Sequence, residues 1–545
     1  MMFLSTLLSS VLITIALIPL FGRLAVRFRA LDVPNERKVH AMPIPRSGGP
    51  AMALGAMLPI VAWNYADGFT QAYLAGAAVL VVTGLADDLR ELSPRAKFSG
   101  QILAALIAIF WGGVQIWSLG GLLPDGFLLP AWIAAPLTVV AIVGVTNAIN
   151  LSDGLDGLAG GICLLCFCCI GYLAYLTGNG SVGLIAVALA GGIFGFLRFN
   201  THPASIFMGD AGSQFLGFSA VTLSLALTQG NTPVSPLLPL IVLGFPILDT
   251  LTVLLTRIAQ GRSPFSADKN HFHHNLMGLG LHHTEAVLVI YVLQTALILS
   301  AFAFRFYSDW ILLGGYLVFS ALVLTGFTVA RRTGWRLKRF DLLDVVIKGN
   351  LRRLREQGVI IRETFRVSEA AIPLLLLFTC ILPNEVPGGV SFLCLGMLAA
   401  VLAVWRFRKE SLGTVLRFAL YLLIPFAVYL GDERPAVWLK GAALGAYNAA
   451  FGLFAVFIVV VSKFTRRRMG FKNTPMDFLI LFLAVVVPNL PEPHIQAHRI
   501  GLVAAKIIML YFSYEVLMAE ERGRYGKVAL ATAASLAVLA VRGRM

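Results

Sequence analysis

Two adjacent carboxylates, Asp87 and Asp88, stand where a long apolar run of the sequence gives way to a short polar segment. Like charges at the edge of an apolar run repel each other, so a cation should lie nearby. Arg90, Lys97 and a bound Mg²⁺ are the candidates for that cation. The alternative is that the pair is an ordinary polar helix end.

A second polar segment, 146–158, contains no Lys or Arg to balance its acids and amides, which are Asn147, Asn150, Asp153 and Asp156. The last three recur every third residue, so a helical turn would place them on one side. Burying them between apolar runs is costly without a partner. A divalent cation with oxygen ligands is the favoured partner, and structural hydrogen bonding is the alternative.

Asp210 stands between glycines at the start of another apolar run. It could cap a helix or supply a further metal ligand. Asp249 is different, because it lies inside an apolar run beyond Pro246. An acid at such a depth is a functional candidate by default, although it could simply pair with a neighbouring helix.

The segment 32–50 could bind phosphate, since it carries Lys38, His40 and Arg46. Its Pro and Gly spacing predicts an ordered turn with backbone amides available near residues 47–49. The alternative is that these residues only anchor the chain at a membrane boundary.

Five of the nine histidines fall within thirteen positions, namely His271, His273, His274, His282 and His283. Zinc is disfavoured because no cysteine accompanies them, and Mg²⁺ disfavours imidazole. We therefore interpret the cluster as a set of donors for a diphosphate, assisted by Lys269 and Arg262.

The apolar runs that must position these groups dominate the composition. The chain has 545 residues, of which 58% are hydrophobic and only 13% are charged, with a mean hydropathy of +0.82. Runs of roughly 17 to 25 apolar residues are long enough to cross a bilayer. The sequence thus predicts an all-α, polytopic transmembrane helical bundle with about eleven spans before residue 330. They are 3–21, 48–64, 70–86, 100–117, 129–147, 159–177, 181–197, 212–228, 236–257, 286–304 and 310–330.

The orientation follows from the basic residues. Up to residue 330 there are fourteen Lys and Arg, and all except Arg305 fall in alternate loops. By the positive-inside rule these loops, which also carry the polar motifs, face the cytoplasm. The net charge of +15 is therefore a sign of membrane topology, and we expect no nucleic-acid partner.

Three domains are predicted along the chain. Residues 1–335 form the catalytic membrane domain, and 336–368 form a basic amphipathic cytoplasmic linker. An amphipathic surface helix on anionic lipid and a solvated linker are equally favoured for this stretch. Residues 369–545 form a C-terminal transmembrane domain of five to seven further spans, in which no catalytic constellation is visible.

Collected on one membrane face, these groups suit phosphoryl transfer, which requires positioning and charge neutralisation. Carboxylates and Asn would hold Mg²⁺, while His, Lys and Arg would neutralise phosphate. The surrounding apolar bundle suggests that one substrate is a lipid. A lipid phosphomonoester is already largely dianionic at neutral pH, so it needs little help from a base.

The motifs also carry a family resemblance over residues 1–335. They are Asp87-Asp88, Asn147-x-x-Asn150-x-x-Asp153-Gly-x-Asp156-Gly-Leu, Phe207-Met-Gly-Asp210-x-Gly-Ser and Asp268-Lys-x-His271-x-His273-His274. In order and spacing this set resembles the polyprenyl-phosphate N-acetylhexosamine-1-phosphate transferases. The His motif resembles the branch that uses UDP-N-acetylglucosamine, because it lacks three consecutive histidines followed by an acidic residue.

The resemblance implies transfer of a sugar 1-phosphate from a UDP-sugar to undecaprenyl phosphate, with release of UMP. Such a reaction would initiate O-antigen or cell-wall polysaccharide assembly at the bacterial inner membrane. Mg²⁺, with Mn²⁺ as a substitute, would bind through Asn150 and Asp210.

The resemblance also implies roles for the other motif residues. Asp87 and Asp88 would organise the lipid phosphate or the metal, with acceptance of a proton as a further role. Asp153 and Asp156 would contact the nucleotide or maintain the site. Substrate contacts are expected from Lys38, Arg46, Asn147, Lys269, His271, His273 and His274. Whether the chain forms a homodimer is left open.

A transporter or flippase of a lipid-linked sugar is the alternative from another functional class. It would be expected to place ionisable residues near the midplane and to show related halves. Here nearly all acids stand at span ends and the two halves do not match, so the transferase is favoured.

Overall fold

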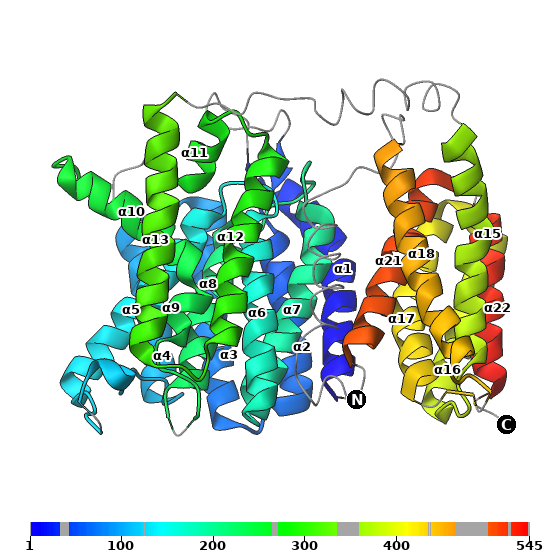
Figure 1. The fold of residues 1–545 in the computed structure, drawn as a ribbon, viewed down its shortest axis with the longest axis horizontal. Helices are drawn as coiled ribbons and strands as arrows, with labels where there is room; N and C mark the ends of the chain where they lie inside the picture. Colours follow the sequence, from blue (N-terminus) through cyan, green and yellow to red (C-terminus); the bar gives the residue numbers. More distant parts are fainter. Residues whose placement is uncertain are drawn as a thin grey trace. The chain divides into compact units, whose positions relative to one another are not determined.

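The computed structural model describes residues 2–32, 43–124, 126–230, 232–263, 271–334, 359–433, 435–436, 438–464, 500–521 and 525–542. The chain divides into two units, Met1–Lys338 and Arg339–Met545. Ten of the described helices are long and apolar enough to cross a membrane. Together with the near absence of strands in the described ranges, they confirm the predicted all-α polytopic bundle (Figure 1).

The first unit begins with α1 (Met2–Phe28), a two-stranded hairpin and α2 (Gly48–Asn64). The hairpin pairs β1 (Leu31–Asp32) antiparallel with β2 (Ile44–Pro45). The helices that follow are α3 (Gly68–Arg90), α4 (Pro94–Phe110), α5 (Ala131–Ser152), α6 (Leu158–Leu176), α7 (Gly180–Asn200), α8 (Gly209–Thr228), α9 (Leu238–Val242), α10 (Gly244–Ala259), α11 (Phe272–Gly278), α12 (His283–Ala303) and α13 (Asp309–Arg332), with the 3₁₀ turn η1 (Gly120–Leu122) before α5.

The centre of this unit is α8. The apolar part of α8 is 94% buried inside the protein, whereas that of α13 is only 17% buried. Helices α3 and α5 pack on α8 at positions where a larger residue would not fit. A Cβ at Gly84 of α3 would overlap the backbone of Ala211, and one at Gly217 of α8 would lie 2.7 Å from Cα of Thr146. Such close backbone approach is typical of membrane helix packing. It brings the ends of α3, α5 and α8 together.

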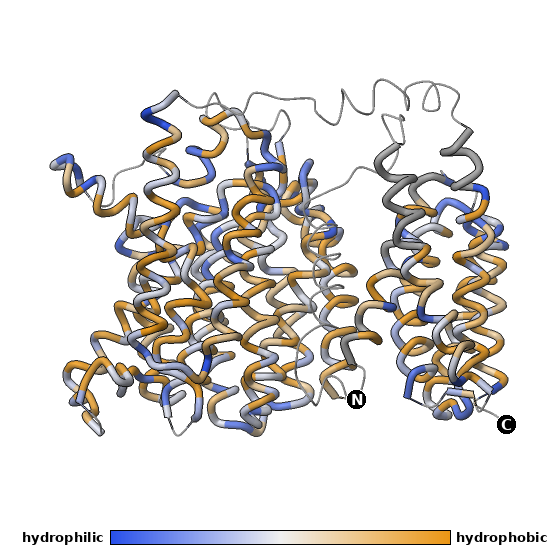
Figure 2. Tube along the Cα trace, in the orientation of Figure 1, coloured by the Kyte–Doolittle hydropathy of each residue, from blue (hydrophilic) through white to orange (hydrophobic). Residues whose placement is uncertain are grey.

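Two predicted spans differ from the helices observed. The span predicted at 236–257 is divided at Leu243 into α9 and α10, because Pro246 in the first turn of α10 lacks an N–H for a continuous helix. The span predicted at 100–117 ends at Phe110. Gly113 has φ of +68°, a left-handed conformation that commonly follows a helix end. Most of each described helix consists of apolar residues, and the hydrophilic residues lie mainly toward the helix ends (Figure 2).

Two segments of the second unit, Gly388–Phe407 and Lys409–Glu433, are long and apolar enough to cross a membrane, so the five to seven further spans stay a prediction. The unit contains six described helices. They are α15 (Val359–Ile381), α16 (Gly388–Phe407), α17 (Leu412–Glu433), α18 (Ala442–Phe464), α21 (Ile500–Glu521) and α22 (Gly526–Arg542), with the turn η2 (Lys409–Ser411) before α17. Its own apolar core includes Leu376, Leu416 and Leu536. The basic linker predicted at 336–368 lies outside the described residues up to Gly358, and α15 begins at Val359.

Candidate active site

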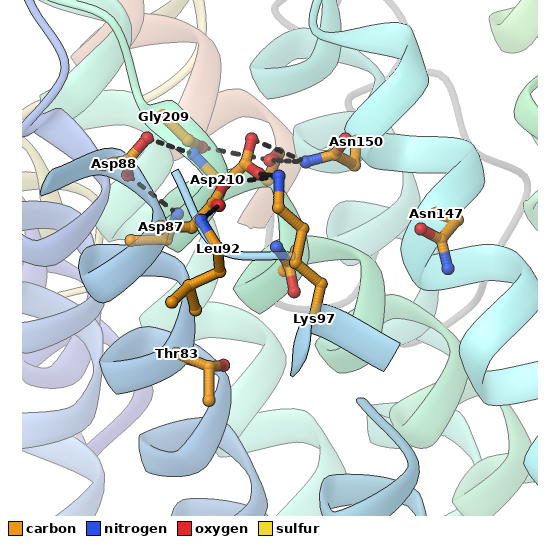
Figure 3. A network of polar contacts seen from close by, with 12 residues as sticks. Thr83, Asp87, Asp88, Leu92, Lys97, Asn147, Asn150, Gly209 and Asp210 are labelled. Atoms are coloured by element: carbon orange, nitrogen blue, oxygen red, sulfur yellow. Dashed lines mark hydrogen bonds and ion pairs between the residues drawn. The ribbon is translucent and has the colours of Figure 1, made fainter. Parts of the chain in front are cut away.

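The polar residues of the candidate site lie where the C-terminal ends of α3 and α5 meet the N-terminal ends of α4 and α8 (Figure 3). Asp87 and Asp88 come from the last turn of α3, and Lys97 comes from the first turn of α4. Asn150 comes from the last turn of α5 and Asp210 from the first turn of α8. Polar residues at helix ends are thus brought together by the packing of apolar helix bodies.

Asp88 caps the N-terminus of α8. Its two carboxylate oxygens accept hydrogen bonds from the backbone N–H groups of Asp210 at 3.0 Å and Ala211 at 3.2 Å. These are amides of the first helical turn, which have no partner within the helix, and the helix dipole favours a negative charge there. Gly209 is required beside this contact, because its φ is +67° and a Cβ would overlap the Asp88 carboxylate.

Lys97 is the cation that neutralises the acidic cluster. Its Nζ lies 2.5 Å from Oδ2 of Asp87 and 3.0 Å from Oδ2 of Asp210. The other oxygen of Asp87 accepts the N–H of Leu92 at 2.7 Å. Of the two local candidates for a partner of the acid pair, Lys97 is therefore confirmed as the partner of Asp87.

Asn150 connects α5 to the same cluster. Its Nδ2 donates to Oδ1 of Asp210 at 3.2 Å and to Oγ of Ser213 at 2.8 Å. Asn147, one turn earlier, instead donates to Oε1 of Gln101 at 2.7 Å. The structure thus brings Asn150 to Asp210, as expected for a shared ligand set, and places Asn147 in a neighbouring amide network.

Asp153 and Asp156 do not lie on one helical face with Asn150, so that prediction is wrong. Helix α5 ends at Ser152, and the ψ of Asp153 is +40°, so the chain leaves the helical path before it reaches Asp156. Withdrawal from water, followed by the nearby charges of Asp210 and Asp88, raises the pKa of Asp153 well above its usual range. Asp153 therefore belongs to the electrostatic environment of the Asp88–Asp210 cluster.

Asp156 faces another set of residues. Its Oδ2 lies 2.7 Å from Nδ1 of His202 and accepts the N–H of Ala204 at 3.1 Å. Its own N–H donates to Nε2 of His283 at 3.1 Å. Partial burial opposes ionisation of Asp156, but the contact with His202 and the nearby His283 lower its pKa. These contacts join three chain segments, as a positioning residue would.

Sequence reasoning did not assign His202 to a site and placed His283 with the diphosphate donors. Their rings stack with centroids 4.4 Å apart, beside Asp156. The adjacent Pro203 and the polar surroundings of His202 were the available signal in the sequence, but they did not indicate its partner.

The His motif is attached to the bundle by Asp249. Nδ1 of His271 lies 3.0 Å from Oδ2 of Asp249, and the N–H of Phe272 donates to Oδ1 at 2.8 Å. Burial, followed by the neighbouring His274, lowers the pKa of His273 to about 3. Without a bound anion His273 is therefore neutral near pH 7, and it can donate one hydrogen bond. Its ring lies against Gly154, where a Cβ would overlap it.

Arg46 follows β2, forms an ion pair with Asp32, and lies close enough to Asp88 and Asp210 to interact electrostatically with both. Two of the backbone amides expected at residues 47–49, those of Gly48 and Gly49, are not available to a ligand. Gly48 N–H donates to the carbonyl of Phe207, and Gly49 N–H donates to that of Met208, each at 2.9 Å. Lys38 and Lys269, predicted to contact substrate, lie outside the described residues.

The donor set of Asp87, Asp210 and Asn150 fits a hard divalent cation, which takes carboxylate and amide oxygens. The Lys97 ammonium lies between Asp87 and Asp210, so a divalent cation held by both acids would have to share them with Lys97 or displace it. Asn150 would have to present its amide oxygen, and the two ends of an amide are assigned only by their hydrogen-bond network.

In the transfer reaction that the sequence predicts, Lys97→Met should lower kcat/KM by about 10- to 100-fold, because a hydrogen bond to a charged group contributes about 1.5–3 kcal/mol. The measurement is the initial rate of nucleotide release at saturating Mg²⁺. Arg95→Met is the matched control, since Arg95 lies on the same helix, is exposed and carries the same charge. Equal rates for the two variants would contradict a role for Lys97.

Comparison with known proteins identifies the family of the chain. A family model described as glycosyl transferase family 4 matches residues 70–228, which run from within α3 to the end of α8 and contain the acidic cluster. The chain is 37% identical to a probable undecaprenyl-phosphate N-acetylglucosaminyl 1-phosphate transferase of Bacillus subtilis (strain 168), over 58% of this chain and 87% of that protein.

Two further relatives have related names. The undecaprenyl-phosphate alpha-N-acetylglucosaminyl 1-phosphate transferase of Escherichia coli (strain K12) is 31% identical, over 64% of this chain and 95% of its own length. The decaprenyl-phosphate N-acetylglucosaminephosphotransferase of Mycobacterium leprae (strain TN) is 35% identical, over 52% of this chain and 79% of its own. This chain thus belongs to glycosyl transferase family 4, the polyprenyl-phosphate N-acetylhexosamine-1-phosphate transferases.

Proposed function

We propose that this protein transfers N-acetylglucosamine 1-phosphate from UDP-N-acetylglucosamine to undecaprenyl phosphate, giving the lipid diphosphate sugar and UMP, and so initiates a surface glycan. The observation that carries the proposal is the cluster of Asp87, Asp88, Lys97, Asn150 and Asp210 at the ends of apolar helices. The relatives' printed names supply the polyprenyl phosphate and the N-acetylglucosamine. None of the three is named as a transporter or flippase, and that alternative has no further support.

In this reaction an oxygen of the lipid phosphate forms a bond to the sugar-bearing phosphorus of the donor. The bond from that phosphorus to the bridging oxygen breaks, and UMP leaves. The attacking oxygen is already anionic near neutral pH, so the protein need not remove a proton. Its task is to bring two anions together and to stabilise charge in the transition state.

Mg²⁺, when bound, would neutralise phosphate oxygens and stabilise the developing charge, and Asp210, Asn150 and Asp87 would hold it. Asp88 fixes the first turn of α8 and so orients Asp210. Lys97 and Arg46 are placed to offset the negative charge of the acids and of an incoming phosphate. Asp153, Asp156 and the His motif would bound the donor side of the site.

The test is UMP release from UDP-N-acetylglucosamine by the full chain with undecaprenyl phosphate and Mg²⁺. We expect release that depends on both substrates, stops on chelation with EDTA and yields a lipid diphosphate product. UDP-N-acetylgalactosamine in parallel assigns the sugar. No UMP release with any donor would refute the proposed function.

Two arms of this assay test the topology and the domain assignment. The positive-inside pattern predicts that the site faces the cytoplasm, so inside-out vesicles of the inner membrane should consume added donor and sealed right-side-out vesicles should not. A chain ending at Gly334 should retain release, because all the proposed site residues precede that position. The reverse vesicle result would overturn the orientation, and loss of activity in a folded truncated chain would overturn the assignment of catalysis to the first unit.

A further inference from the structure

Asp249 is a buried acid that the transfer reaction, as outlined, does not use. It lies in α10, one turn after Pro246, and is only 3% exposed. A carboxylate in an apolar bundle is costly unless it is paired and hydrogen-bonded. Its position therefore requires a specific partner.

The partners of Asp249 both come from the start of the His motif. One carboxylate oxygen receives the backbone N–H of Phe272, the first residue of α11, and the other lies 3.0 Å from Nδ1 of His271. A carboxylate accepts, so Nδ1 of His271 carries the proton. This fixes both the ring orientation and the tautomer, and leaves Nε2 as the atom available to another group.

The ring of His271 is linked by packing contacts to the loop that carries Asp153. His271 stacks on His273 with centroids 5.8 Å apart and planes 11° apart. The His273 ring in turn lies against Gly154, the residue after Asp153, where a Cβ would overlap Nε2 and Cε1. A displacement of His271 would therefore shift His273 and, through it, the loop that carries Asp153.

We propose that Asp249 is a positioning residue for the donor nucleotide sugar, acting through His271 and the first N–H of α11 to hold the His motif against the Asp153 loop. The inference rests on the proposed function, in which the His motif lies on the donor side of the site. In this role Asp249, on α10, holds the His motif at the start of α11 in the conformation that binds the donor. Carboxylates behind histidines orient metal ligands in the same way, and their loss typically costs about 10- to 100-fold in affinity or activity.

Asp249→Asn preserves the size of the side chain but not its two acceptors. The amide oxygen can still accept the Phe272 N–H, whereas the amide NH₂ would face Nδ1 of His271 and force the other tautomer or a ring rotation. We expect KM for UDP-N-acetylglucosamine to rise roughly 10-fold or more, with KM for undecaprenyl phosphate and kcat within about threefold of the wild type. The double variant Asp249→Asn/His271→Asn should be no worse than the single variants, since the two residues act as one unit.

Thr250→Ala is the matched control, because Thr250 is the next residue of α10 and its buried hydroxyl has no hydrogen-bond partner among the described residues. It should leave both KM values unchanged. Equal losses for both substrates, or additive effects in the double variant, would show that Asp249 only supports the fold and would overturn the proposal.

Amide hydrogen exchange separates this proposal from the proposed function. Exchange at Phe272–Asn275 should rise in Asp249→Ala, which removes the acceptor of the Phe272 N–H, and not in Thr250→Ala, in the full chain without substrates. Unchanged exchange would overturn the positioning role, even if wild-type UMP release is observed. Raised exchange in a wild-type protein that releases no UMP would instead refute the proposed reaction and leave the anchoring in place.

Discussion

Asp210→Ala should reduce UMP release by roughly 10³-fold or more, since a catalytic metal contributes several kcal/mol of transition-state stabilisation. The side chain lies within hydrogen-bond distance of Lys97 at 3.0 Å and Asn150 at 3.2 Å. No other acid of the described residues makes both contacts. The measurement is the rate of UMP release over a Mg²⁺ titration, in which raised Mg²⁺ should restore little activity.

The variant should still fold, because Asp88 caps α8 through backbone N–H groups that alanine retains. Alanine is also a good helix former. Asp309→Ala is the matched control, since Asp309 is likewise the acid in the first turn of a helix, here α13, and its partners Ser235 and Gly121 are outside the acidic cluster. Robust release by the Asp210 variant would remove this residue from the proposed metal site.

The membrane bundle and the clustering of its polar ends could be predicted from sequence, because both follow from local hydropathy and the alternation of basic loops. Helix ends in alternate loops share a membrane face, so Asp87, Asn150 and Asp210 could be expected on the same side. The division of α9 from α10 could not be placed in the same way. Pro246 indicates a local disturbance, but whether a helix bends or breaks depends on what packs around it.

The individual contacts could not be predicted, because they join residues far apart in the chain. Asp88 and the α8 amides are separated by 122 and 123 positions, and only the packing of α3 on α8 brings them together. The same holds for Asp249 with His271 and for Asp156 with His202. The turn amides of Gly48 and Gly49 were expected to bind an anion, but the Phe207 and Met208 carbonyls that occupy them come from another loop.

Asp88→Asn should lower kcat by about 100-fold while costing only about 1 kcal/mol of stability. The asparagine oxygen can accept one of the two α8 amides, and its NH₂ group would be directed at the other. The first turn of α8 would then shift, and Asp210 with it. Loss of the negative charge also removes a favourable interaction with the α8 dipole, worth about 0.3–1 kcal/mol. UMP release and thermal unfolding in detergent are the two measurements.

Asp67→Asn separates the two effects, because Asp67 caps the opposite end of α3. The Asp67 carboxylate accepts hydrogen bonds from the N–H of Thr70 at 3.0 Å and from the Thr70 hydroxyl at 2.8 Å. The Asp67→Asn variant should therefore lose about as much stability as Asp88→Asn. It changes no group near Asp210, and kcat should stay within about twofold of the wild type, since caps act within the first helical turn. If both variants lost the same small fraction of activity, Asp88 would be a helix cap and nothing more. A selective loss in Asp88→Asn would show that this cap also sets the position of Asp210 for transfer.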